Sequence, residues 1–137
     1  MLSGLIAGIL AGLAMFLLFL ISDVLFFSKH GEFKASRHYE SNARRAAILL
    51  AIAVVHFGVL GAIFGLFREG IPGVTLVGKG LLFGFAAALI LSRQSVEALF
   101  FFDEEYVPRR YAYYWLIEYL VGYTMGGGLT GALYNIA

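Results

Sequence analysis

The 137-residue chain contains no cysteine and few charged residues, which make up 14% of its composition. The lack of cysteine excludes disulfides, thiolate metal sites and cysteine nucleophiles. The net charge is only +1, so the chain also lacks the basic signature of a nucleic-acid-binding protein. It holds no phosphate-cradling loop, zinc-protease motif or serine-nucleophile elbow. We therefore expect no catalytic residues, and enzyme activity only as a subunit of a larger enzyme.

What the chain has in abundance is apolar surface, because 61% of its residues are hydrophobic. Soluble domains are nearer 45–50% apolar, and a chain this short could not bury the excess in a water-soluble core. The composition predicts an integral membrane protein with one domain, residues 1–137, and the lipid bilayer as its main partner. No Lys or Arg precedes Lys29, so the first apolar stretch is expected to be a span rather than a signal peptide.

Four stretches are long enough to cross a bilayer as helices, for which about 20 apolar residues are needed. We predict spans at about 2–27, 46–67, 74–102 and 112–136, an all-α four-transmembrane-helix bundle. The third span allows two registers, because 74–92 contains Lys79 whereas 80–102 contains Arg93 and Glu97. We favour one long helix over 74–102, with these charges at its two interfaces.

Basic residues gather in two of the three predicted loops. Residues 28–45 hold five and 93–111 hold three, whereas the loop between them holds only Arg68 and Lys79. The positive-inside rule predicts that loops 28–45 and 93–111 are cytoplasmic and that both termini lie outside, in a plasma or inner membrane. Aromatic residues near the third loop are expected to form an interfacial belt: Phe100–Phe102, Tyr106, Tyr111, Tyr113, Tyr114 and Trp115.

Glycines recur four residues apart within the spans. This spacing lets helix backbones approach closely, which drives helix association in lipid. The packing could lie within one chain or between chains, so a homo-oligomer or other membrane subunits are expected partners. The residues concerned are Gly4, Gly8, Gly12, Gly61, Gly65, Gly80, Gly84, Gly122, Gly126, Gly127 and Gly131.

These glycines also indicate an internal repeat. The stretch Gly4–Gly8 aligns with Gly80–Gly84, and Gly61–Gly65 aligns with Gly127–Gly131. The pattern is typical of two tandem helical hairpins, formed by spans one and two and by spans three and four. Glycine-rich helices also align by chance, so both interpretations stay open.

Five ionisable residues fall within or beside the spans: Asp23, His56, Arg93, Glu97 and Glu118. Charge in a bilayer is costly, so each is a candidate site for protons, ions or a ligand. Four of them fall toward the cytoplasmic ends of their spans and His56 falls near mid-membrane, at depths where they could meet.

His56 has three interpretations. It could donate one hydrogen bond to a neighbouring helix, or relay protons with Glu118, since histidine titrates near neutrality. It could also ligate haem, but the other two histidines, His30 and His38, lie in the polar loop, so another subunit would have to supply the second ligand. With no recognised metal spacing in that loop, we predict neither metal nor cofactor, with haem at His56 as the alternative.

The carboxylates are also open to more than one interpretation. Glu118 could pair with Arg93, Arg109 or Arg110 near the interface, or could carry a proton or bind a cation. Asp23 is expected to be a helix-end residue at the interface.

The glycine-spaced first helix, the stretch His56-Phe-Gly-Val-Leu-Gly-Ala-Ile-Phe-Gly65 and the glycine-rich stretch Val121–Tyr134 resemble the YagU-like small bacterial inner-membrane proteins. The resemblance implies a protein on a four-helix scale and of poorly defined function. That family tends to carry a histidine ahead of the last glycines, where this chain has Glu118 and Tyr119. No functional residue is therefore carried over.

Three functions follow from these features, in order of preference. The first is a non-catalytic subunit or self-associating scaffold of a membrane complex. The second is an oligomeric proton- or ion-coupled carrier or channel that uses His56 and Glu118. The third is a membrane anchor of an electron-transfer enzyme, with haem bound at His56.

Overall fold

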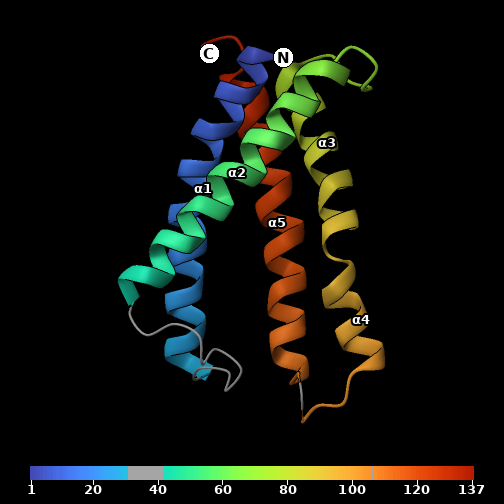
Figure 1. The fold of residues 1–137 in the computed structure, drawn as a ribbon. Coiled ribbons are helices and arrows are strands. Elements are labelled where there is room, and N and C mark those ends of the chain that lie inside the picture. Colours follow the sequence, from blue (N-terminus) through green and yellow to red (C-terminus); the bar gives the residue numbers. More distant parts are fainter. Residues whose placement is uncertain (31–41, 106) are drawn as a thin grey trace.

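The computed structural model describes residues 1–30, 42–105 and 107–137, and within these residues the only regular secondary structure is helix (Figure 1). The helices are α1 (Leu2–His30), α2 (Asn42–Phe67), α3 (Leu76–Leu91), α4 (Arg93–Phe101) and α5 (Arg109–Leu133). His38 lies outside the described residues, as do Tyr106 and most of loop 28–45.

Three segments of the described chain are long and apolar enough to cross a membrane: Leu2–Phe26, Ala46–Phe67 and Leu76–Phe101. The sequence prediction of membrane-spanning helices is confirmed for these three by length and composition. α5 is long, with 25 residues, but it is less apolar because it contains several tyrosines and glycines and Glu118.

The third segment differs from the prediction of one helix over 74–102. It starts at Leu76, where the Thr75 hydroxyl accepts a hydrogen bond from the Gly78 amide at 3.0 Å, as an N-cap does. It is then interrupted at Ser92, between α3 and α4. The Ser92 hydroxyl bonds the Leu89 carbonyl at 3.2 Å, and serine side chains bonded to the preceding turn commonly bend helices.

α1, α2, the α3–α4 segment and α5 run alternately up and down, and both chain ends lie at the same end of the molecule (Figure 1). α1 packs mainly against α2, and α3 packs mainly against α5. α5 also contacts α1 and α4, so it occupies the centre of the arrangement. α2 crosses α1 at a slant, so it does not extend along the lower half of α5 (Figure 1).

The core lies where the two helix pairs meet. Met15, Phe57, Ala88 and Tyr123 are its buried members. The Phe57 and Tyr123 rings are stacked with centroids 5.1 Å apart, and Tyr119 stacks on Tyr123 at 5.5 Å. Aromatic packing therefore joins α2 to α5 at this level.

Candidate functional site

Glycines form the contact between α1 and α2. A methyl group added at Gly4 would overlap the Gly61 carbonyl oxygen, and one at Gly8 would overlap the Phe57 carbonyl oxygen. At Gly12 the same methyl would lie 2.8 Å from the Ala53 oxygen. The two backbones are therefore in direct contact along three helical turns.

The contact between α3 and α5 has the same form. A methyl group at Gly80 would overlap the Gly127 carbonyl oxygen, and one at Gly84 would overlap that of Tyr123. In the register of the sequence repeat, Gly127 is equivalent to Gly61 and Tyr123 to Phe57. The residues that align in sequence thus make equivalent contacts.

Further glycines of α5 face aromatic side chains. The Phe19 ring of α1 lies against Gly122, and the Phe57 ring of α2 lies against Gly126, in each case where a Cβ atom would stand. Gly131 lies against the backbone of Leu76. Small residues on several faces of α5 therefore let three helices approach it closely.

A polar cluster joins α1 to α5. The Tyr114 hydroxyl donates to Asp23 Oδ1 at 2.7 Å and lies 2.7 Å from the Ser22 hydroxyl. It also lies 3.3 Å from Glu118 Oε1. The Phe26 ring covers the cluster by stacking on Tyr114, with centroids 4.0 Å apart. The sequence predicted similar membrane depths for Asp23 and Glu118. In the structure both carboxylates lie next to the Tyr114 hydroxyl.

His56 lies apart from this cluster. Its side chain is exposed on α2, and its Nδ1 atom is 3.4 Å from the hydroxyl of the buried Tyr123. Among the described residues, no hydrogen bond joins His56 to Glu118.

Arg93 and Glu97 pair with each other on α4, where Arg93 Nε lies 2.7 Å from Glu97 Oε1 and both side chains are exposed. Arg109 pairs with Glu104 at 2.9 Å. Within the described chain, neither arginine has an ion pair with Glu118. These residues form exposed surface pairs, separate from the cluster on α1 and α5.

Sequence reasoning missed Ser22 and Tyr114, and it placed Tyr114 in an interfacial belt. Tyr114 precedes Glu118 by one helical turn and Ser22 precedes Asp23, so the spacing on α5 was a usable signal. Which helix Tyr114 faces depends on how α1 packs, and that was not visible in the sequence.

A second polar group of contacts lies at the end that holds both termini. Arg68 donates from Nη1 to the Gly65 carbonyl and to the Tyr134 hydroxyl, each at 2.9 Å. Lys79 Nζ donates to the Arg68 carbonyl, also at 2.9 Å. Lys79 therefore ties the start of α3 to the carbonyl end of α2.

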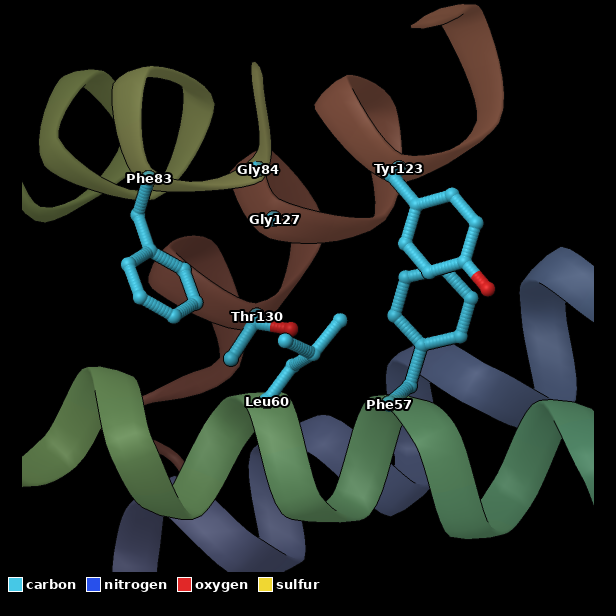
Figure 2. Close-up of a pocket in the computed structure, with 7 residues that line it drawn as sticks. All are labelled: Phe57, Leu60, Phe83, Gly84, Tyr123, Gly127 and Thr130. Atoms are coloured by element: carbon cyan, nitrogen blue, oxygen red, sulfur yellow. The ribbon is translucent and has the colours of Figure 1, made fainter. Parts of the chain in front are cut away.

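Figure 2 shows a small cavity between α2, α3 and α5. Its free volume is about 10 Å³, near the minimum that holds one water molecule. The lining is almost entirely apolar, with Thr130 as its small polar member, and that hydroxyl donates to the Gly126 carbonyl at 2.8 Å. The lining residues are Phe57, Leu60, Phe83, Gly84, Tyr123, Gly127 and Thr130.

The part of the chain that the structure describes contains no group of three or more His, Asp or Glu side chains placed to hold a metal ion. His30 is the last residue of α1, and the structure does not describe its side chain. Comparisons of the chain with models of protein families, with curated proteins and with solved structures find no match.

Proposed function

We propose that this chain is a four-span integral membrane protein that acts as a non-catalytic subunit or self-associating scaffold of a membrane complex. The observation that carries the proposal is the position of His56. It lies at the centre of the apolar segment Ala46–Phe67, yet its side chain is exposed. A polar group that faces hydrocarbon at mid-membrane is costly, and a partner helix that covers it removes the cost.

The environment of α5 supports a fourth span. Its 25 residues extend about 37 Å as a helix, longer than the roughly 30 Å hydrocarbon core. Its neighbours α1, α2 and α3 are the three apolar helices. Most of its glycines, together with Tyr111 and Tyr123, are buried against these neighbours. A less apolar helix can cross lipid when other helices cover its polar and small residues.

The arrangement of the ends supports the proposed topology. Both termini lie at one end, and the basic first turn of α2 lies toward the other (Figure 1). Arg109 and Arg110 begin α5 at that same end. With the basic end in the cytoplasm, both termini face outward.

Native mass spectrometry tests this function. Membranes that contain the tagged chain are excised into polymer-bounded lipid discs without detergent exchange, and the intact assemblies are weighed. We expect a defined homo-oligomer or a complex with fixed stoichiometry. A lone 15.0 kDa chain in discs large enough for several copies would overturn the proposal.

A second candidate function, an ion- or proton-coupled carrier, is favoured by the cluster around Tyr114. The Tyr114 hydroxyl brings Asp23 and Glu118 together, and two neighbouring carboxylates are the kind of group that binds a proton or a cation. Proteoliposomes would then show a flux driven by a pH or ion gradient that falls at least tenfold in Glu118→Gln. Glu97→Gln, which removes an exposed carboxylate on α4, is the matched control. Equal fluxes in all three proteins would count against the carrier.

A further inference from the structure

The polar cluster around Tyr114 lies on the contact that joins the two helix pairs. α1 belongs to the first pair and α5 to the second, and the two helices pack against each other (Figure 1). Ser22 and Asp23 come from α1, whereas Tyr114 and Glu118 come from α5. The Tyr114 hydroxyl therefore links one pair to the other.

The hydrogen bonds of this hydroxyl depend on where its single proton goes. A phenol donates once and can accept through its oxygen lone pairs. The shortest carboxylate contact of Tyr114 is Asp23 Oδ1 at 2.7 Å, which takes the proton. Glu118 Oε1 lies 3.3 Å from the same oxygen and then faces a lone pair. An ionised Glu118 can only accept, whereas a protonated one donates to the Tyr114 oxygen and completes the cluster.

Loss of the Glu118 proton places two negative charges beside one hydroxyl. The nearest oxygens of Asp23 and Glu118 lie within about 6 Å of each other, because each contacts the Tyr114 oxygen, and like charges repel at that range. The Phe26 ring covers Tyr114 on one side, and charges that water screens less repel more strongly. Ionisation of Glu118 therefore pushes α1 away from α5.

No described cation offsets this repulsion at Glu118. Besides Asp23 and Tyr114, the titratable groups that interact with its charge are the phenols of Tyr119 and Tyr123 on α5. His56 of α2 contacts Tyr123 instead. The charged side chains of α1, α3, α4 and the first turn of α5 are exposed or bonded to other groups, and they are Lys29, Lys79, Arg93, Glu97, Arg109 and Arg110.

We propose that the protonation of Glu118 is a pH-sensitive switch for the contact between the two helix pairs. With the proton present, Glu118, Tyr114 and Asp23 form a chain of hydrogen bonds from α5 to α1. When higher pH removes the proton to water, α1 separates from α5 at this level, while the glycine contacts within each pair hold. The inference goes beyond both proposed functions, because it requires neither an assembly nor a transported ion.

Distances between spin labels test the switch, because the cysteine-free chain takes labels only at introduced thiols. Val24→Cys and Ile117→Cys form the reporting pair, since each is exposed and adjacent in sequence to a carboxylate of the cluster. Leu10→Cys with Val59→Cys, also exposed, is the matched pair on α1 and α2. Pulsed electron paramagnetic resonance measures both distances in phosphatidylcholine vesicles equilibrated from mildly acidic to mildly alkaline pH.

We expect the α1–α5 distance to shift to longer values as the pH rises, and the α1–α2 distance to stay constant. Glu118→Gln cannot ionise and keeps a donor for the Tyr114 oxygen, so it should hold the short distance at every pH. Asp23→Asn removes one of the two charges and should reduce the shift. Glu97→Gln should keep the full shift, since that carboxylate pairs with Arg93 on α4. The α1–α2 pair, measured in each variant, reports whether the first hairpin is intact.

Three outcomes would overturn the switch: an α1–α5 distance that is the same at every pH, an equal shift in Glu118→Gln, or an equal shift between α1 and α2. These results are separable from the failure of the proposed functions. If lipid discs hold single chains but the distance still shifts, the scaffold is wrong and the switch stands. If proteoliposomes show the flux but the distance stays constant, the carrier stands and the switch is wrong.

Discussion

The α1–α2 pair and the α3–α5 pair are built from the same glycine-to-carbonyl contacts, yet their second helices have different surroundings. α5 contacts α1 and α4 as well as α3, whereas α2 packs mainly against α1. The positions that differ explain this. α5 has Gly122 and Gly126 where α2 has His56 and Leu60, so aromatic rings can lie directly on the α5 backbone.

Glycine spacing thus determines how closely two helices approach, but it does not determine which other faces of those helices are covered. Coverage depends on side-chain volume at the remaining positions of each helix. A helix with small residues on several sides becomes the centre of the bundle even when it is the least apolar of the long helices.

The largest effect is expected where the two pairs join. Phe57→Ala removes a ring that is 2% exposed and packs against Phe19, Tyr123 and Gly126. Large-to-small substitutions of buried aromatic residues cost about 3–5 kcal/mol, so we expect loss of about 3 kcal/mol in the free energy of unfolding. Titration with sodium dodecyl sulfate from mild micelles, followed by circular dichroism, measures it. The exposed Phe85→Ala is the control, and an equal loss there would contradict the central role of Phe57.

An intermediate effect is expected at the paired glycines. Gly61→Ala and Gly127→Ala place a methyl group on the backbone of the facing helix, which cannot move aside as a side chain can. Overpacking of this kind costs about 1–3 kcal/mol. The matched controls are Gly58→Ala and Gly128→Ala, whose new methyl groups meet only the side chains of Ile9 or Leu5, and of Leu81.

The same unfolding titration compares the loss of stability in the two helix pairs. The loss should be larger for Gly127→Ala than for Gly61→Ala, because α5 cannot shift without disturbing α1 and α4 as well. If the controls lose as much stability as the paired glycines, backbone contact is not what holds the pairs together.

The smallest effect is expected at the polar link between the pairs. Tyr114→Phe keeps the ring stacked on Phe26 but removes the hydroxyl that contacts Ser22, Asp23 and Glu118. Hydrogen bonds between membrane helices contribute about 0.6–2 kcal/mol, and we expect a loss of about 1 kcal/mol. Tyr113→Phe, at an exposed position, should change stability by less than the error of the measurement. A loss above that of Phe57→Ala would mean that the polar link, rather than the aromatic core, joins the pairs.

Much of the helical framework could be predicted from the sequence, because long apolar stretches are local signals. The bounds were less accurate: α1 reaches His30 and α2 begins at Asn42, both beyond the predicted spans, and Ser92 divides the third segment. A break at one serine depends on a hydrogen bond to its own helix, which composition does not reveal.

The candidate site was predicted only in part. Asp23 and Glu118 could be singled out because charge is rare in apolar helices, but their common contact, Tyr114, was predicted only as a member of an interfacial belt. A relay between His56 and Glu118 was one of three interpretations, and the described structure shows His56 exposed on α2 with Nδ1 3.4 Å from the Tyr123 hydroxyl. The depth of a residue along its helix can be predicted from its position in the sequence. Which neighbouring helix its side chain faces depends on how the helices pack.

The sequence by itself determined that the chain is helical, that at least three of its segments are apolar enough to span lipid, and which glycines recur at four-residue spacing. These properties follow from residue type and local spacing, so no other part of the chain is needed to read them. Only the tertiary structure decided that α5 is central, that two carboxylates reach one tyrosine hydroxyl, and that α2 keeps an uncovered face. Each of these depends on the packing of helices that are distant in the chain, where side-chain volume decides which surfaces meet.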